Sequence, residues 1–351
     1  MPEIIIGGRR IGPEHSPFII AEAGINHNGE PARALEMVRL AKQAGADAIK
    51  FQTFKAAEFV GDAAQTYTYQ SQGKDVTESM FEMFRRCELP SDSWTVIKAE
   101  CDRLNIAFLS TPQNRTDLDL LTKVGVTAVK VGSDDFTNLP LLKSYATTKL
   151  PLILSCGMAD MSEVYRSLQT VGALDGYPTV LLLCTSQYPT PPADVNLRKL
   201  LTLKAAFPMI PMGFSDHTVG SMASSLACAL GACVFEKHFT LGNDLPGPDH
   251  WFSESPDGLS TWVQSIRAAY TMLGSDIVRP TEAELEMRKL ARRSIAVIRD
   301  IQTGERLDVS NIALRRPGTG LTPDLFDSML GGTALRNLRA GELLRLGDVR
   351  K

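Results

Sequence analysis

The sequence lacks the features that mark secreted, membrane-bound or disulfide-linked proteins. Its six cysteines include no Cys-x-x-Cys pair, and most lie in apolar runs, as buried free thiols do in a reducing compartment. No basic segment followed by an apolar core stands at the N-terminus, and the longest apolar stretch, around residues 222–235, is too short and too rich in Ala, Ser and Cys to span a bilayer. We expect a cytoplasmic protein that does not insert into a membrane.

An excess of positive charge is also missing. With 37 Lys and Arg against 40 Asp and Glu, the formal net charge is −3, and no run of basic residues offers a surface for nucleic acid. An anionic substrate would therefore need local lysines. What is present, 44% hydrophobic and 22% charged residues over 351 positions, is typical of a globular protein with one large domain and a smaller appendage.

Eight short apolar runs are separated by amphipathic stretches of helical length. Most runs begin apolar and end in polar residues, as expected for parallel strands that are buried on both faces and expose chemistry at their carboxyl ends. The runs are residues 18–24, 48–54, 106–112, 128–133, 151–157, 180–185, 210–215 and 233–240. The amphipathic stretches include residues 31–44, 91–104, 115–124, 162–171 and 220–230.

Eight strand–helix units in roughly 270 residues predict an α/β protein with a (β/α)8 TIM barrel. An open doubly wound sheet is the structural alternative, less favoured because no GxGxxG turn follows the first run. Near residue 281 the pattern changes to a charged helical segment and then to short alternating segments separated by glycine turns. We expect a catalytic barrel over residues 1–275, a linker over 276–293 and a small, mainly β domain over 294–351.

Two lysines end apolar runs of the predicted barrel. A lysine is costly in such a position unless it is paired, so Lys50 and Lys130 predict an anion site for phosphate and carboxylate, although either could be a solvated surface charge. The hydroxyls of Thr111, Ser133 and Ser155 follow other strands. Each alone is typical of a turn, but together they resemble a phosphate cradle.

Two of the five histidines lie at the ends of strands that should be neighbours. His217 and His238, with a carboxylate of Glu236, Asp216 or Asp249 nearby, make a mixed nitrogen and oxygen set. Such a set suits Mn²⁺, Mg²⁺ or Fe²⁺ with open positions better than a closed zinc site. The simpler interpretation is that both histidines cap strands or bond to the backbone.

The segments that carry these residues resemble the sialic acid synthase family, whose members make N-acetylneuraminate, legionaminate or pseudaminate. The matching segments run in order through the predicted barrel: IAEAGINHNG (20–29), GADAIKFQT (45–53), FLSTP (108–112), KVGS (130–133), SCGM (155–158), CTSQYPT (184–190), GFSDHT (213–218), EKHFT (236–240) and GPD (247–249). The C-terminal part resembles the family's antifreeze-like (SAF) domain, with RRPGTG (315–320) as its substrate-reaching turn.

The resemblance implies a role for each matched residue. His217 and His238 would hold Mn²⁺, with Mg²⁺ or Co²⁺ as alternatives. Phosphoenolpyruvate would be bound by Lys50, Thr111, Lys130, Ser133 and Ser155. An acetamido sugar would be bound, and protons transferred, by Glu22, Gln52, Asp135, Tyr188 and Asp249. Arg316 would reach the sugar from the small domain. Ser215 also belongs to the substrate-binding residues. In this family the small domain commonly covers the barrel of a partner subunit, so a domain-swapped homodimer is expected.

Several positions depart from the family pattern. A frequent Ser-Gly-Glu is Ser133-Asp-Asp135, which shortens the carboxylate side chain by one methylene. Gln113 stands in place of Phe, Cys156 in place of Thr, and Ser186-Gln187 where Asn is common. We expect these changes to tune which sugar fits, since both histidines and both lysines are intact.

The expected reaction joins C3 of phosphoenolpyruvate to the aldehyde carbon of an N-acetylated hexosamine such as N-acetylmannosamine. Water then adds at C2, positioned by Glu22 or Asp135, and phosphate leaves by C–O cleavage. The alternatives are a Schiff-base aldolase using Lys50 or Lys130, a synthase acting on an aldose phosphate, and a non-catalytic sugar- or ice-binding protein. The sequence leaves the acceptor sugar open.

Overall fold

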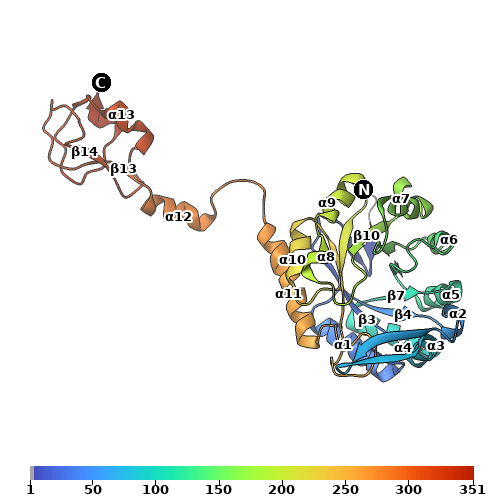
Figure 1. Ribbon diagram of the computed structural model, residues 1–351. Coiled ribbons are helices and arrows are strands. Elements are labelled where there is room, and N and C mark those ends of the chain that lie inside the picture. Colours follow the sequence, from blue (N-terminus) through green and yellow to red (C-terminus); the bar gives the residue numbers. More distant parts are fainter. Residues whose placement is uncertain (1–3) are drawn as a thin grey trace. The chain divides into compact units, whose positions relative to one another are not determined.

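The computed structural model describes residues 4–351, which form two compact units divided between Gly274 and Ser275. The first unit is a closed barrel of eight parallel strands (Figure 1). In barrel order these are β3 (Phe18–Gly24), β4 (Ala48–Thr53), β7 (Ala107–Pro112), β8 (Val129–Val131), β9 (Leu152–Ser155), β10 (Thr179–Cys184), β11 (Met212–Asp216) and β12 (Val234–His238). Every predicted run falls on one of these strands, so the expected TIM barrel is confirmed.

Helices alternate with the strands and cover the outside of the barrel (Figure 1). A capping box of Asn114 and Asp117 begins α5, and Gly125, with φ of 94°, ends it just before β8. Between strands and helices, Phe51, Trp94 and Phe108 pack edge-on or tilted, with ring centroids 5.9 to 6.2 Å apart. The main helices are α1 (Pro31–Gln43), α4 (Ser91–Leu104), α5 (Arg115–Val124), α6 (Leu139–Ala146), α7 (Met161–Thr170), α9 (Lys199–Ala206), α10 (Met222–Ala229) and α11 (Pro256–Leu273).

Apolar side chains fill the amino-terminal end of the barrel. β1 (Ile4–Ile6) and β2 (Arg9–Ile11) pair antiparallel and add Ile4 and Ile6 to a buried cluster that contains Phe18, Ile20 and Leu109 of the strands. Fully burying an aliphatic or aromatic side chain stabilises a fold by about 1.5–3 kcal/mol. Because this end of the barrel is filled with apolar side chains, the polar side chains that could bind a substrate lie at the carboxyl ends of the strands.

A β-hairpin is inserted between β4 and α4. Its strands, β5 (Thr66–Ser71) and β6 (Lys74–Ser79), are joined by Gln72 and Gly73, both with positive φ, and flanked by α2 (Ala56–Phe59) and α3 (Met80–Cys87). The Ser71 hydroxyl accepts a hydrogen bond from the Gly247 backbone amide, and the Gln72 side chain donates from its Nε2 to the Asp244 carbonyl. These bonds fasten the hairpin to the loop between β12 and α11.

The second unit is small and mainly β, apart from α12 (Glu282–Ala291) and α13 (Phe326–Met329). β13 (Ser294–Val297) pairs with β14 (Ile312–Arg315), and β15 (Thr333–Ala334) pairs with β16 (Val349–Arg350), both antiparallel. Its own buried cluster includes Ile295, Ile301, Leu307, Leu338 and Leu344. This unit has the architecture that we expected of a SAF domain.

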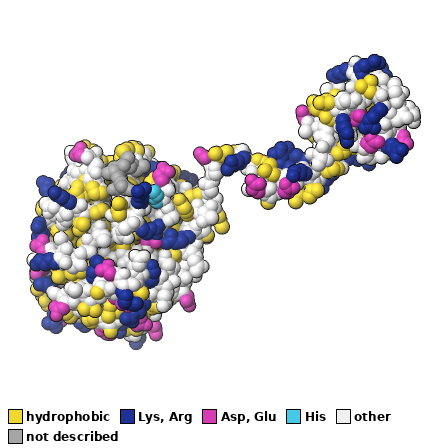
Figure 2. Space-filling view, turned by 180° about the vertical axis from the view of Figure 1, so that it is seen from behind, with side chains coloured by type: hydrophobic (Ala, Val, Ile, Leu, Met, Phe, Trp, Pro, Cys, Tyr) yellow, Lys and Arg dark blue, Asp and Glu magenta, His cyan; other side chains and the backbone are white. Residues whose placement is uncertain are grey.

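The visible surface of the barrel unit mixes charges of both signs (Figure 2). Lys and Arg are interspersed with Asp and Glu there, in line with the small net charge of −3. Among residues 4–351, none of the helices has both the length and the apolar character that crossing a bilayer requires.

Two fully buried histidines lie in the loops beside the barrel mouth. The His27 Nδ1 accepts a hydrogen bond from the Gly29 amide at 3.0 Å, and the His250 Nε2 lies 3.1 Å from the Asn28 Oδ1. Burial, with the nearby Arg33 charge, lowers the pKa of His27 to about 3 and that of His250 to about 4. Both side chains are therefore neutral at physiological pH.

We predict that the protein loses stability as pH falls from 6.5 to about 4. Below 6.5 the unfolded chain binds protons at these histidines and the folded chain does not, so each contributes a loss of about 1.4 kcal/mol at pH 5.5. Urea unfolding at pH 7.5 and 5.5 measures this difference. The stability difference between the two pH values should be smaller in the His27→Gln variant than in wild type. It should be unchanged in His15→Gln, because His15 is partly exposed. Equal pH dependence in His27→Gln and wild type would show that His27 does not cause the loss of stability.

Candidate active site

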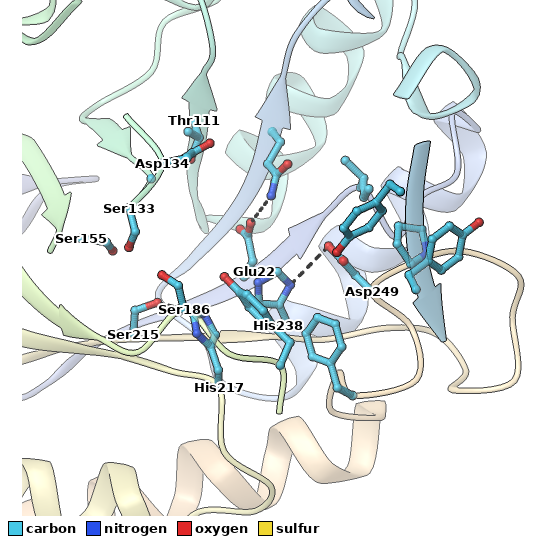
Figure 3. A pocket seen from close by; sticks show the side chains of 18 of the residues that line it. Glu22, Thr111, Ser133, Asp134, Ser155, Ser186, Ser215, His217, His238 and Asp249 are labelled. Carbon is cyan, nitrogen blue, oxygen red and sulfur yellow. Dashed lines mark hydrogen bonds and ion pairs between the residues drawn. The ribbon is translucent and has the colours of Figure 1, made fainter. Parts of the chain in front are cut away.

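One cavity of about 720 Å³ opens at the carboxyl ends of the barrel strands, and all eight strands or the loops that follow them line it. Figure 3 shows side chains from these strands pointing into a common space. The structure brings together there most of the residues predicted from the sequence: Glu22, Lys50, Gln52, Thr111, Lys130, Ser133, Ser155, Tyr188, Ser215, His217, His238 and Asp249.

A buried network of charges forms the floor of this cavity. The Lys50 Nζ lies 2.8 Å from the Glu22 Oε2 and donates to the Thr111 hydroxyl at 3.1 Å. The Lys130 Nζ donates to the Ser155 hydroxyl at 2.9 Å. Glu236 lies between the two lysines, 3.8 Å from the Lys50 Nζ and 3.5 Å from the Lys130 Nζ. Each lysine thus has a carboxylate partner, which is what makes its burial tolerable.

The two carboxylates of this network have pKa values shifted in opposite directions. Burial raises the pKa of Glu22 above its ordinary value; the Lys50 ammonium opposes this and the Glu236 carboxylate adds to it. Burial also acts on Glu236, but the ammonium groups of Lys130 and Lys50 hold the pKa of Glu236 below its ordinary value. Such a divergence separates a proton carrier from a permanent counter-charge. The sequence had suggested Glu236 only as a metal ligand, because its bridging position depends on distances between strands.

Hydroxyl and amide donors surround the ammonium groups. The Ser133 hydroxyl accepts from the Gly157 amide at 3.1 Å and lies 3.4 Å from the Cys184 Sγ. A side chain at Gly157 would put its Cβ within 2.5 Å of the Ser133 and Ser186 hydroxyls, so only glycine leaves this corner open. The arrangement suits the oxygens of a small anion.

The two predicted metal ligands lie close together at the ends of the neighbouring strands β11 and β12. The ring centroids of His217 and His238 are 5.6 Å apart. The His217 Nδ1 donates to the Thr185 carbonyl, 2.8 Å away, which leaves its Nε2 as the nitrogen that can bind a cation. Within residues 4–351, the buried His238 Nδ1 has no hydrogen-bond partner, and it lies 3.9 Å from the Asp249 Oδ2 (Figure 3). Burial, aided by the His217 charge, lowers the pKa of His238 well below 6.5, so its ring is neutral.

These donors fit a divalent cation with open coordination positions. In the described part of the chain, no group of three or more His, Cys, Asp or Glu side chains is arranged to hold a metal ion. The two imidazoles would therefore share a cation with water or substrate oxygens, as Mn²⁺ and Mg²⁺ tolerate. Burial opposes the charge on His217, but the neighbouring Cys184 and the Thr185 carbonyl raise the pKa of His217, so this ring would give up its proton when a cation binds. Asp216, suggested from the sequence as an oxygen ligand, bonds instead to Thr218 and Ser224.

Aromatic side chains line the cavity beside the two histidines. Tyr188 packs against His217 with ring centroids 4.2 Å apart and against Phe252 at 5.1 Å. Trp251 and Phe252 come from the loop after β12, and Tyr67 comes from the β5–β6 hairpin. None of these three residues was predicted from the sequence to belong to the site. The alternation of Thr and Tyr over residues 66–69 and the Gln72-Gly73 turn were the signals of the hairpin.

Two predicted site residues lie elsewhere. Asp134, not Asp135, lines the cavity, and the Asp135 carboxylate accepts a hydrogen bond from the Asn138 side chain at the start of α6. Because β8 ends at Val131, the alternation of a strand does not extend to residue 135. Arg316 lies in the second unit, directly after β14, and its contact with a sugar stays a prediction.

Comparison with known proteins identifies relatives over nearly the whole chain. The NeuB family model matches residues 37–278, and a SAF domain model matches residues 292–350. The N,N'-diacetyllegionaminic acid synthase of Legionella pneumophila is 42% identical over 95% of this chain and 94% of its own length. The pseudaminic acid synthase of Helicobacter pylori is 32% identical over 95% of this chain and 98% of its own length. The structure of N-acetylneuraminic acid (sialic acid) synthetase from Leptospira borgpetersenii matches with a TM-score of 0.72 and 33% identity over 81% of this chain and 94% of that one.

Proposed function

The chain belongs to the NeuB family, and from that premise we propose that it is a nonulosonic acid synthase, which joins phosphoenolpyruvate to an acetamido sugar aldehyde and releases phosphate. The observation that carries the proposal is the presence, in one cavity, of two buried ammonium groups ringed by hydroxyls and of two neighbouring imidazoles. The first set suits a phosphorylated carboxylic acid, and the second suits a cation that polarises an aldehyde.

Phosphoenolpyruvate would bind over Lys50 and Lys130. Its carboxylate and phosphate carry several negative charges, and the hydroxyls of Thr111, Ser133 and Ser155 add neutral donors around the ammonium groups. Buried donors attract charge more strongly than donors in solution and need no reorganisation during the reaction. The lysines would thus orient C3 of the enolpyruvate toward the aldehyde.

The sugar would lie between the imidazoles and the loop after β12. His217 and His238 would hold a divalent ion, which we propose is Mn²⁺, with Mg²⁺ or Co²⁺ as alternatives; when bound, it would supply Lewis-acid stabilisation of the oxygen of the aldehyde. Gln52 and Asp249, which both line the cavity, would bond sugar hydroxyls. Burial raises the pKa of Asp249 to about 7, and Glu22 adds to this shift.

The covalent steps balance without a further reagent. The enolpyruvate C3 forms a bond to the aldehyde carbon, whose oxygen becomes a hydroxyl. Water adds to C2 and supplies the proton for that hydroxyl. The C2–O bond to phosphate then breaks, C2 becomes a ketone, and its hydroxyl proton leaves with the phosphate. Glu22, whose pKa is raised by burial, is our candidate for taking the proton from water, while Glu236 stays ionised as the counter-charge of the lysines.

We propose that the acceptor is a 2,4-diacetamido-2,4,6-trideoxyhexose. The relative with 42% identity is a N,N'-diacetyllegionaminic acid synthase. The cavity wall beside Tyr67 contains Phe59, Met80, Met83 and Phe84, an apolar lining that suits the methyl groups of a deoxy sugar with two acetamido groups better than a row of hydroxyls.

Tyr67 provides a test of this wall. Its ring stacks on Tyr69 with centroids 5.9 Å apart, and it is 43% exposed. Tyr67→Ala is expected to raise the KM for the acceptor about tenfold, as the loss of one aromatic contact predicts, and to leave the KM for phosphoenolpyruvate unchanged. Tyr165→Ala, at a 48% exposed tyrosine on α7, is the matched control. A similar rise in both KM values would count against a sugar-facing role.

Phosphate release tests the function directly. The protein is incubated with phosphoenolpyruvate, Mn²⁺ and a panel containing the diacetamido sugar, N-acetylmannosamine and mannose, with and without a chelator. Release that needs both a sugar and the metal supports the proposal, and the fastest sugar identifies the acceptor. No release with any sugar would overturn it.

A Schiff-base aldolase is the second candidate, because one observation favours it. Burial lowers the pKa of Lys130, as an amine nucleophile requires. Borohydride with pyruvate and an acetamido sugar would then inactivate the protein and add mass at Lys130, whereas the synthase should be unaffected.

The family resemblance also supports a homodimer in which Arg316 of one subunit reaches the sugar bound to the other. A mixture of Lys130→Met and Arg316→Ala subunits should then be more active than either variant alone. Equal inactivity of the mixture would contradict the exchange.

A further inference from the structure

A buried polar cluster lies directly behind His217 and His238. Asp216 and Lys237 precede His217 and His238 in sequence and are paired in register across β11 and β12. Because side chains alternate along a strand, both point away from the cavity and toward α10 and α11. The Asp216 cluster consists of Asp216, Thr218, Ser224, Lys237, Glu254 and Trp262.

Asp216 holds the backbone that follows β11. Its carboxylate is fully buried and accepts hydrogen bonds from the Thr218 amide and the Thr218 hydroxyl, both at 2.8 Å. Ser224 of α10 donates to it at 2.6 Å, and the Trp262 indole of α11 donates to Ser224 at 2.9 Å. His217 therefore stands in a turn whose two ends are tied to one carboxylate and, through it, to two helices.

Lys237 connects this turn to the other histidine. Its ammonium group lies 3.3 Å from the Asp216 Oδ2 and 3.7 Å from the Glu254 Oε1, and it donates to the Thr218 carbonyl. The Glu254 carboxylate accepts from the Gly220 amide at 3.2 Å, and its backbone amide donates to the His238 carbonyl at 2.9 Å. The cluster thus joins the backbone beside His217 to the backbone of His238.

We propose that Asp216, Lys237 and Glu254 are positioning residues that set the separation of the two imidazoles for a divalent cation. The inference rests on the proposed function only in taking His217 and His238 as metal ligands. Stability alone does not account for the cluster, since well-packed apolar residues stabilise a barrel wall as well as buried charges do. Groups outside the coordination shell that orient metal ligands usually change metal affinity ten- to a hundredfold when removed, in order of magnitude.

The test measures metal binding apart from catalysis. Free Mn²⁺ is followed by electron paramagnetic resonance during titration of wild type, Asp216→Asn, Lys237→Met, Glu254→Gln and Asp47→Asn, and thermal unfolding is recorded for each. Asp47 is the matched control: its carboxylate is paired with Arg267 at 3.0 Å, is 10% exposed, and lies at the opposite end of the barrel wall. Glu254→Gln is the mildest change, because the Glu254 side chain is 17% exposed.

The cluster variants are expected to bind Mn²⁺ about tenfold or more weakly, and Lys237→Arg to recover part of the loss. Asp47→Asn should lower the melting temperature without changing the affinity for Mn²⁺. If Asp216→Asn and Glu254→Gln bind Mn²⁺ as tightly as wild type does, the positioning role is overturned and the proposed metal site is not. Absence of Mn²⁺ binding to wild type would overturn the proposed metal site, and this inference with it.

Discussion

Lys130→Met is expected to lower kcat/KM for phosphoenolpyruvate by about a thousandfold. The variant removes a buried cation beside the proposed anion site and leaves Glu236 with Lys50 as its remaining cationic partner in the network. Loss of one preorganised donor to a developing charge costs about 10²–10³ in rate, and the unbalanced carboxylate would further repel an anionic substrate. Steady-state phosphate release measures the effect.

A surface lysine provides the control for this prediction. Lys98→Met removes an exposed pair with Asp102 on α4, a kind of interaction worth less than about 1 kcal/mol, and should leave the kinetics unchanged. A Lys130→Met enzyme within tenfold of wild type would show that phosphoenolpyruvate binds without Lys130. Thermal unfolding of the variant separates loss of the fold from loss of the site.

Removal of the metal, or of His238, is expected to abolish phosphate release. Among residues 4–351 the Nδ1 of His238 has no hydrogen-bond partner, and the ring is neutral, as a metal ligand must be. Lewis-acid stabilisation of an alkoxide contributes several kcal/mol, so His238→Ala should lose roughly a thousandfold in kcat. A chelator should abolish wild-type activity, and added Mn²⁺ should restore it in wild type but not in His238→Ala.

The matched histidine control is His15→Ala, at a partly exposed position near the amino-terminal end of the barrel. It should behave as wild type in every condition. Full activity of wild type in excess chelator would overturn the metal-dependent mechanism and leave the lysines as the main electrostatic catalysts. The two predictions therefore address separate halves of the cavity.

The polar ends of the strands were predictable from hydrophobic periodicity. Lys50, Lys130, His217 and His238 were placed at one barrel mouth because most of the eight apolar runs of strand length ended in polar residues. Barrel topology brings such ends together whatever the details of packing. Asp135 was misplaced, because its position depends on the path of the chain after Val131, where strand alternation no longer applies.

The sequence by itself determined the TIM barrel, the family and most of the side chains at its mouth, because hydrophobic periodicity and motif order are properties of the chain alone. Only the tertiary structure decided the partners of each charge: Glu236 between two lysines, Tyr67 brought into the wall by the hairpin, and Lys237 joined to Asp216 behind the histidines. These residues are far apart in sequence or face opposite sides of a strand. Their interactions depend on strand register and on distances of a few ångströms, which periodicity does not encode.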